Sequence, residues 1–234
     1  MIQQYITSGI RVFGVGGGGS NLVNYMHDHG VCGADIFICN TSIEELCMHR
    51  TPLKLHLGNG TLGSGSNTEY ATSEAVNSLD DIKKCLEGAK VIIIVSTLGG
   101  GTGTAVAPII AKESKAMGII TLSIATLPFR FEGEKKMAKA LEGLAQLTRL
   151  SDSIYIYNNQ GLMDLHPELS IDKAFGLVGE IVGKMAFNLA ESYDIDITTL
   201  APIKEEKQVI ETTVLKKKGI ISRAVSFLRG LVNR

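Results

Sequence analysis

The chain has 234 residues, 44% of them hydrophobic, and a formal net charge of −1, so it can bury the core of one large α/β domain. Residues 216–234 hold six basic residues and no acid, which leaves −7 for residues 1–215 once those six are subtracted from −1. This acidic body argues against nucleic-acid binding. The longest aliphatic run is too short to span a bilayer, and the amino end lacks the pattern of a secretory signal.

Five short apolar segments rich in β-branched residues alternate with helical patterns along the chain. They lie at residues 10–15, 35–40, 90–96, 119–126 and 153–158. Strands that are apolar on both faces and alternate with helices are typical of a parallel sheet covered on each side. We therefore predict a three-layer α/β fold with a mainly parallel sheet and helices on both faces. The helices are expected at residues 20–29, 43–49, 68–87, 104–117, 134–149 and 170–192.

The alternation of strands and helices stops after residue 193. The following stretch is polar and weakly patterned, and a new pattern begins at Lys216. We therefore expect one domain at residues 1–200, a linker at 201–215 and a basic amphipathic helix at 216–234. The four cysteines form no CxxC pair, and His27 and His29 would face different ways on a helix, so we expect reduced thiols and no metal ligands among these residues.

Half of the 26 glycines lie in three clusters, at residues 14–19, 58–65 and 99–103. Each cluster falls where a strand should lead into a helix, at the carboxyl edge where open α/β sheets bind ligands. Glycines before a helix let the backbone approach an anion, and the free amides of the first turn supply donors. The segment GGGTGT, residues 99–104, therefore predicts a phosphate-binding loop.

The first cluster also fits GxGxxG, through Gly14, Gly16 and Gly19, which leaves a nicotinamide-dependent oxidoreductase open as an alternative. In that class the second strand ends in an acid that holds a ribose, whereas here it ends at Asn40. The chain contains no GxxxxGK[ST] sequence, so a P-loop is not expected.

Three segments together resemble, in the same order, the signature segments of the tubulin and FtsZ family. They are FGVGGGGSNLVNYM at residues 13–26, GGGTGT at 99–104 and LPFRFEGEKKMAKA at 127–140. The resemblance covers about residues 10–193. It implies a bacterial GTPase that binds GTP or GDP with Mg²⁺ and hydrolyses GTP between stacked subunits.

Carried over by position, the resemblance assigns the first and second glycine loops to the phosphates and GSGSN, residues 63–67, to the γ-phosphate side. Glu132 would reach the ribose, and Asn158 would read the guanine edge with Phe175 against the ring. Glu180 stands where the family usually has Asp as an acceptor for guanine. The residues expected at the nucleotide are Gly16, Gly17, Gly18, Gly19, Ser20, Asn40, Gly65, Ser66, Asn67, Gly99, Gly100, Gly101, Thr102, Gly103, Thr104, Glu132, Lys136, Asn158, Phe175 and Glu180.

The family supplies its hydrolytic acids from the loop after the long central helix to the nucleotide of the next subunit. Asp194 and Asp196 are the corresponding catalytic residues here, and their spacing is shorter than the family's N-x-D-x-x-D pattern. The resemblance therefore implies a head-to-tail filament of copies of this chain. A second α/β domain follows in the family, whereas only about forty residues remain here.

Residues 216–234 carry apolar side chains at spacings of three and four, with basic side chains between them. Such a helix would lie flat on an anionic membrane, although packing on its own domain or on a partner protein remains open. The expected membrane-binding residues are Ile220, Ile221, Phe227, Leu228, Leu231, Lys216, Lys217, Lys218, Arg223 and Arg229.

These features together predict a short FtsZ-like GTPase that assembles head to tail and attaches to membrane, similar to the group proposed in membrane remodelling or division-related processes. We expect a cytoplasmic protein, peripheral at the inner face of the cell membrane. The alternative is a weakly hydrolysing GTP-binding regulator or scaffold of other filaments.

Overall fold

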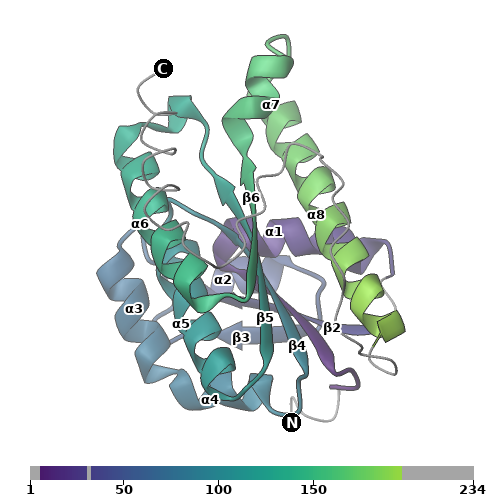
Figure 1. Ribbon diagram of the computed structural model, residues 1–234. Coiled ribbons are helices and arrows are strands. Elements are labelled where there is room, and N and C mark those ends of the chain that lie inside the picture. Colours follow the sequence, from purple (N-terminus) through teal and green to yellow (C-terminus); the bar gives the residue numbers. More distant parts are fainter. Residues whose placement is uncertain (1–5, 31–32, 197–234) are drawn as a thin grey trace.

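Six parallel strands form one sheet in the computed structural model, which describes residues 6–30 and 33–196. The strand order is β3-β2-β1-β4-β5-β6, and every neighbouring pair runs parallel (Figure 1). The strands are β1 (Ile10–Val15), β2 (Ala34–Asn40), β3 (Leu53–His56), β4 (Val91–Thr97), β5 (Ile120–Leu127) and β6 (Ser153–Asn158). The predicted parallel α/β sheet is confirmed.

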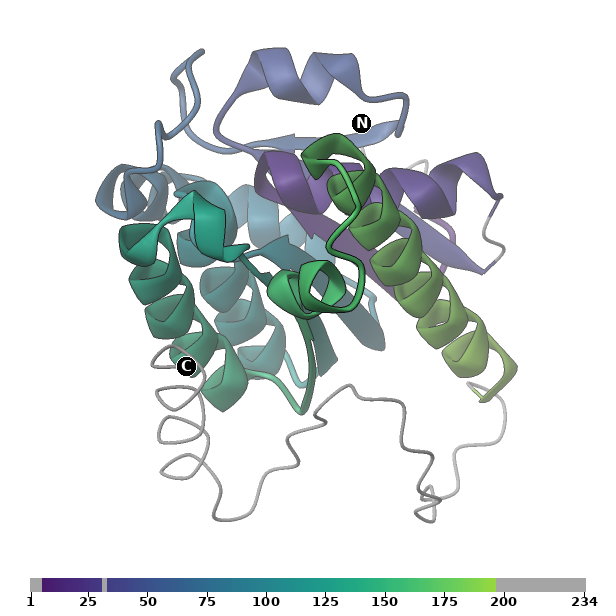
Figure 2. The same ribbon diagram turned by 90° about the horizontal axis from the view of Figure 1, so that it is seen from above.

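Helices cover both faces of this sheet, as Figure 2 shows. The long helices α1 and α8 lie on one face, and α3, α4, α5 and α6 lie on the other. The helices are α1 (Gly16–Asp28), α2 (Ile43–Met48), α3 (Thr68–Asn77), α4 (Leu79–Leu86), α5 (Thr102–Ala116), α6 (Glu134–Leu150), α7 (Asn159–Leu165) and α8 (Ile171–Asp196). The three-layer arrangement predicted from the sequence is therefore confirmed.

Each central strand contributes to two hydrophobic cores, because successive side chains point to opposite faces. In β4, Val91, Ile93 and Val95 pack toward α1 and α8, whereas Ile92 and Ile94 pack toward α5 and its neighbours. All five are fully buried. Burial of each such side chain stabilises the fold by about 1.5–3 kcal/mol, which explains why the strand is apolar without alternation.

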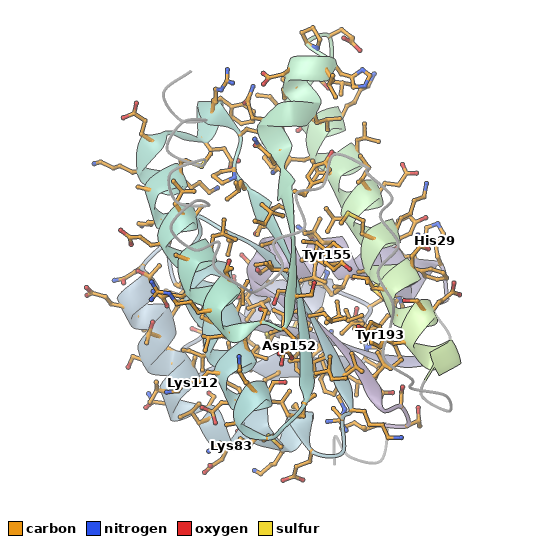
Figure 3. The ribbon with its side chains drawn as sticks, viewed as in Figure 1. His29, Lys83, Lys112, Asp152, Tyr155 and Tyr193 are labelled. Atoms are coloured by element: carbon orange, nitrogen blue, oxygen red, sulfur yellow. The ribbon has the colours of Figure 1, made fainter. Side chains whose placement is uncertain are left out.

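Side-chain hydrogen bonds close the amino edge of the sheet. Asp152 accepts a hydrogen bond from the Thr121 amide at 2.9 Å, and Asp35 accepts one from the Ser8 amide at 2.9 Å. Figure 3 shows Asp152 in the lower half of the molecule, with Tyr155 above it. Both acids therefore bind the protein's own backbone at this edge.

The predicted segment 68–87 is not one continuous helix. It divides at Ser78, whose hydroxyl accepts a hydrogen bond from the Gly58 amide at 2.7 Å and whose φ and ψ of −105° and 15° are not helical. Strand β3 and helix α7 were not predicted. Both are short, with four and seven residues.

Helix α8 continues to Asp196, four residues beyond its predicted end. The predicted linker at residues 201–215 and amphipathic helix at 216–234 lie outside the described residues, and so do all ten expected membrane-binding residues. Within the described part of the chain, none of the helices has the length and apolar character needed to cross a membrane.

Candidate functional site

A cavity of about 550 Å³ opens at the carboxyl edge of the sheet. Residues that follow β1, β2, β4 and β5 line it, and the beginning of α8 closes one side. Strands β1 and β4 are neighbours, so the two glycine loops that follow them meet: a Cβ on Gly16 would lie 2.9 Å from the Gly103 nitrogen. The fold therefore joins clusters that are more than eighty residues apart in the sequence.

The first glycine loop turns directly from β1 into α1. Gly16, Gly17 and Gly18 line the cavity, and Gly16 has a φ of 71°, which favours glycine. Gly19 and Ser20 do not line it: a Cβ on Gly19 would meet the Val95 carbonyl oxygen at 2.5 Å, and Ser20 is buried. Three of the five residues predicted here thus face the cavity, and the other two lie beneath the loop.

The second glycine loop places the amino end of α5 at the cavity. Four of the six predicted residues line it, namely Gly100, Gly101, Thr102 and Gly103. Gly99 and Thr104 instead brace the loop, since the Thr104 hydroxyl accepts a hydrogen bond from the Gly99 amide at 2.8 Å. Two helices, α1 and α5, therefore point their positive amino ends at one space, an arrangement that favours an anion.

The third glycine segment forms the outer wall. Gly65 and Ser66 line the cavity as predicted, together with Ser64. Asn67 does not, because it caps α3 by accepting hydrogen bonds from the Glu69 and Tyr70 amides at 2.9 and 3.1 Å.

Hydroxyl groups connect this wall to the second glycine loop. The Thr102 hydroxyl donates to that of Ser64 at 3.2 Å and lies 3.0 Å from that of Thr41.

Glu132 and Lys136 face the cavity as a pair. The Lys136 ammonium contacts one Glu132 carboxylate oxygen at 2.5 Å, and the other oxygen accepts a hydrogen bond from the Phe129 amide at 2.7 Å. The Glu132 side chain is only 12% exposed. The pair is therefore fixed before any ligand arrives, and both predicted residues belong to the cavity lining.

The side of the cavity near α7 and α8 differs in detail from the prediction. Phe175 lines it, with its ring edge-on to Phe129 at 4.9 Å. Asn158 is exposed and caps α7 through the Gln160 amide at 3.1 Å. Asn159 lines the cavity instead, 4% exposed, with a buried side-chain oxygen that has no partner among the described residues.

Glu180 does not line the cavity. It lies on the exposed face of α8 and pairs with Lys184 at 2.6 Å. The hydrogen bond and charge of Lys184 lower the pKa of Glu180. Gly176 and Gly179 lie on the same part of α8. A Cβ on either would have no neighbour within 4 Å among the described residues. The carboxylate predicted to accept from guanine is therefore engaged elsewhere in this structure.

Asp194 and Asp196 are in the last turn of α8 rather than in a loop after it. A helix rises 1.5 Å per residue, so they lie about 30 Å along the axis from Phe175. The structure therefore does not bring the predicted catalytic acids to the cavity of the same chain.

Several cavity residues were not predicted from the sequence. Asn40 was predicted and is found at the end of β2, but Glu45 on α2, Asn21 on α1 and Thr97 on β4 were not. Glu45 resembles an ordinary first-turn acid of a short helix, which is why its side chain gave no signal. Asn21 directly follows Ser20, the last residue predicted in the first loop, and that position could have been included.

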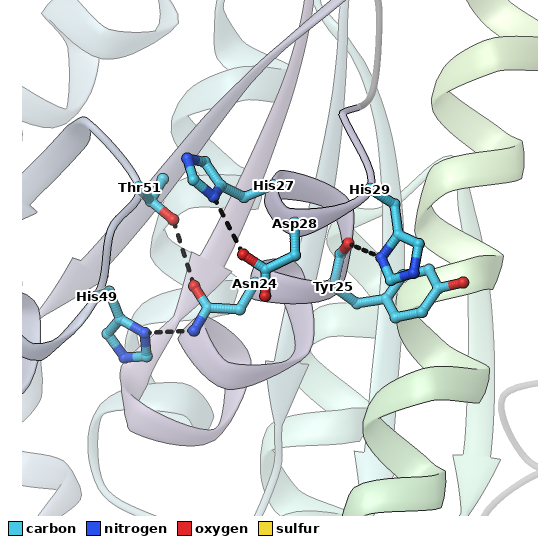
Figure 4. Close-up of polar contacts among 7 residues, drawn as sticks. All are labelled: Asn24, Tyr25, His27, Asp28, His29, His49 and Thr51. Carbon is cyan, nitrogen blue, oxygen red and sulfur yellow. Dashed lines mark hydrogen bonds and ion pairs between the residues drawn. The ribbon is translucent and has the colours of Figure 1, made fainter.

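Three histidines, His27, His29 and His49, lie away from the cavity, toward the other end of α1 (Figure 4). Asn24 contacts His49 at 2.8 Å and accepts from Thr51 at 3.4 Å. His29 stacks on Tyr25 with ring centroids 3.9 Å apart. In the described part of the chain, no three or more His, Cys, Asp or Glu residues gather in a way that could hold a metal ion. The contacts of Asn24 with His49 and Thr51 connect α1 to the segment between α2 and β3.

Comparison with known proteins identifies one family. Residues 9–167 match the GTPase domain of the Tubulin/FtsZ family. The cell division protein FtsZ of Aquifex aeolicus is 42% identical over 179 residues, covering 75% of this chain and 49% of that protein. FtsZ of Mycoplasmopsis pulmonis is 41% identical over 171 residues, covering 72% and 44%. The chain therefore spans about half the length of these curated relatives.

Solved structures show the same likeness. An empty FtsZ dimer from M. jannaschii superimposes with a TM-score of 0.76 and 30% identity, covering 87% of this chain and 59% of that chain. CetZ2 from Haloferax volcanii, in a GTPγS-bound protofilament, gives a TM-score of 0.70 at 20% identity, covering 79% and 59%. The second comparison supports the fold alone.

Proposed function

The chain belongs to the tubulin/FtsZ family, and from that premise we propose that it binds GTP in the cavity at the carboxyl edge of the sheet and hydrolyses it to GDP and phosphate. The observation that carries the proposal is the convergence of two glycine loops, each opening a helix, on one cavity. Their backbone amides can approach phosphate oxygens closely, and the two helix dipoles favour negative charge there.

In this proposal the phosphates lie over Gly16–Gly18 and Gly100–Gly103, and the base lies toward Phe175 and Asn159. The buried side-chain oxygen of Asn159, which has no hydrogen-bond partner among residues 6–30 and 33–196, is an acceptor, and guanine presents donors at N1 and N2. Asn159 therefore suits the base better than the exposed Asn158. Mg²⁺ would travel with the triphosphate and neutralise its charge, and the cavity offers the oxygen ligands that this ion prefers, including the hydroxyls of Thr97 and Thr102.

Titration calorimetry of the full chain with Mg²⁺ tests the proposal. We expect binding of GTP and GDP, and much weaker binding of ATP and NAD. Absence of measurable heat with GTP, alongside binding of NAD, would replace the proposal by the oxidoreductase alternative.

Hydrolysis is proposed to require a second copy of the chain. Asp194 and Asp196 lie about 30 Å from Phe175 along α8, so they can act on a nucleotide only if it is bound by another subunit. One surface of the molecule would then meet a different surface of its neighbour, which gives head-to-tail growth. The GTPase rate per subunit is expected to fall on dilution. A constant rate over a wide dilution series would refute assembly dependence.

A weakly hydrolysing GTP-binding regulator or scaffold is the second candidate. It is favoured by one observation, the location of Asp194 and Asp196 inside the last turn of α8 rather than in a loop. Replacing both residues by alanine distinguishes the two. The enzyme loses turnover and keeps GTP binding, whereas a regulator shows low turnover before and after the change.

Attachment to membrane through residues 216–234 is also proposed, from their sequence pattern. The protein would then be cytoplasmic, peripheral at the inner face of the cell membrane, and active in membrane remodelling or division-related processes. The full chain is expected to sediment with anionic liposomes, whereas a version ending at Leu215 is expected to remain in solution. Equal sedimentation of the two would refute the attachment.

A further inference from the structure

The outer wall of the cavity, residues 63–66, contains a backbone conformation that favours glycine at a residue that is not glycine. Ser66 has a φ of 65°, and among residues 6–30 and 33–196 it is the one residue other than glycine with a positive φ. A residue with a Cβ disfavours this left-handed conformation, because the Cβ comes too close to the backbone. Ser66 is also exposed, so burial does not hold it, and a specific contact is needed.

That contact comes from Lys139 on α6. Its ammonium group donates a hydrogen bond to the Ser66 carbonyl oxygen at 2.8 Å, and the Asn67 amide donates one to the Ser64 carbonyl oxygen, also at 2.8 Å. The Ser66 carbonyl and the Asn67 amide belong to one peptide unit, which is planar. Because both polar groups of this unit are bonded, its orientation is fixed, and the left-handed conformation of Ser66 is fixed with it.

The outer wall lies close to the second glycine loop, so its conformation sets the shape of the cavity on this side. A Cβ on Gly101 would lie 3.0 Å from the Asn67 carbonyl oxygen, and residues 63–66 all line the cavity. A change in the backbone at Ser66 would therefore move residues that line the ligand space.

Thr102 and Lys139 attach the outer wall to α5 and α6, and they differ in their access to a ligand. The Thr102 hydroxyl donates to that of Ser64 at 3.2 Å, and Thr102 itself lines the cavity. A bound phosphate can therefore compete for its single proton. Lys139 is partly buried and does not line the cavity, so its hydrogen bond to the wall is not subject to that competition.

We propose that Lys139 is a positioning residue, which keeps the outer wall in the conformation that binds nucleotide without contacting the nucleotide itself. The inference rests on the proposed GTP site. Without the Lys139 hydrogen bond, Ser66 adopts the more common conformations with negative φ for part of the time. Affinity for nucleotide then falls in proportion to the fraction of molecules whose wall is correctly placed.

The test compares wild type with Lys139→Met, which keeps an unbranched side chain and removes the donor. Affinity for a non-hydrolysable GTP analogue is measured with Mg²⁺ by calorimetry on the full chain. We expect Lys139→Met to bind the analogue about fivefold more weakly, the net effect of one such hydrogen bond. Thermal unfolding midpoints establish that each variant is folded.

Ser66→Gly separates positioning from a general effect of Lys139. Glycine adopts a positive φ as readily as a negative one, so the wall no longer depends on an external contact to reach its binding conformation. In the Ser66→Gly background, Lys139→Met should therefore weaken binding by less than about twofold. The two losses are compared within each background, because Ser66 itself lines the cavity.

The control is Lys135→Met, which removes the same charge from the same helix. Lys135 is exposed and does not line the cavity, so its affinity should match wild type. A loss for Lys135→Met equal to that for Lys139→Met would mean that net charge is responsible, and it would overturn the inference.

Two other results would also overturn it: wild-type affinity in Lys139→Met, or the same loss from Lys139→Met with and without Ser66→Gly. Failure of the proposed function looks different, because wild type itself would then not bind the analogue, and both proposals would fall together.

Discussion

Single residues in this cavity divide into those that face the ligand space and those that hold the loops in place. Adjacent residues fall into different groups: Asn159 faces the cavity whereas Asn158 caps a helix. Gly100 and Gly103 both line the cavity, but they differ in the space around them. The backbone leaves no room for a side chain on Gly103, and it leaves Gly100 with open space. Substitutions at such pairs separate binding from stability.

The asparagine pair gives the first prediction. Asn159→Ala is expected to reduce GTP affinity by tenfold or more, on the order of the cost of one lost hydrogen bond to the base. The free energy of unfolding should change little, because the lost oxygen has no partner in the described part of the chain. Asn158→Ala removes a helix cap and should lower the free energy of unfolding by about 1 kcal/mol while leaving affinity unchanged. Calorimetry and urea unfolding measure the two effects. The reverse assignment of effects would show that Asn158 contacts the base.

The glycine pair gives the second prediction. A methyl on Gly103 would lie 2.5 Å from the Thr97 carbonyl oxygen, so Gly103→Ala forces the start of α5 away from β4 and should lower the free energy of unfolding by about 1–3 kcal/mol. A Cβ on Gly100 would have no neighbour within 4 Å in the described part of the chain, so Gly100→Ala should change the free energy of unfolding by less than about 0.5 kcal/mol. Urea unfolding of both variants provides the measurement, and equal stability of the two would contradict the close approach.

The sequence predicts those helices and strands whose hydrophobic pattern is long and uniform. All five predicted strands are present, because their apolar runs serve two cores. Strand β3, with the sequence LKLH, was missed because it has only four residues and lies at the sheet edge. Helix α7 was missed because its seven residues include Gly161 and have no strong periodicity.

The candidate site shows the same limit. Glycine loops are local signals, and Gly16–Gly18 and Gly100–Gly103, which the sequence singles out, line the cavity. Side chains that arrive by tertiary packing, such as Glu45 from α2, carry no local signal. The ion pair of Glu180 with Lys184 depends on side-chain rotamers, which the hydrophobic pattern of the sequence does not predict.

The Asn67 side chain that caps α3 is expected to stabilise the fold. Asn67 accepts hydrogen bonds from two amides of the first turn, so Asn67→Ala should lower the free energy of unfolding by about 1 kcal/mol and loosen the preceding loop. Asn77→Ala, at the exposed far end of the same helix, is the matched control and should have little effect. Urea unfolding compares them. A larger loss for Asn77→Ala would exclude the capping role.

The whole molecule has one sheet with a core on each face, and its strand order brings β1 next to β4. That adjacency, rather than either loop alone, creates the cavity. In open sheets of this kind, ligands bind where the chain reverses its direction of winding across the sheet. The sequence indicates both loops. It does not indicate that β1 and β4 are neighbours, because the strand order is set by the assembled sheet.

The reactivity of the cysteine thiols tests whether the core of the native protein is accessible to solvent. Burial raises the pKa of Cys39, and it raises that of Cys85 to about 11, so both remain protonated and inaccessible at pH 8. Cys47 is exposed on α2. Iodoacetamide at pH 8 should therefore modify Cys47 in the native protein and reach Cys39 and Cys85 only in urea. Peptide mass spectrometry measures the pattern, and rapid native labelling of Cys39 would show that the core opens.

The hydroxyls of Thr41, Thr102 and Ser64 form a short chain in which Thr102 donates to Ser64. A hydroxyl has only one proton to donate. If Thr102 rotates toward an arriving phosphate, Ser64 loses its donor, and the outer wall of the cavity must find another partner. Rotation of the Thr102 side chain would thereby change the hydrogen bonding of the outer wall when a nucleotide binds. Amide hydrogen exchange at residues 63–66 should then change on nucleotide binding, even where the backbone conformation stays the same.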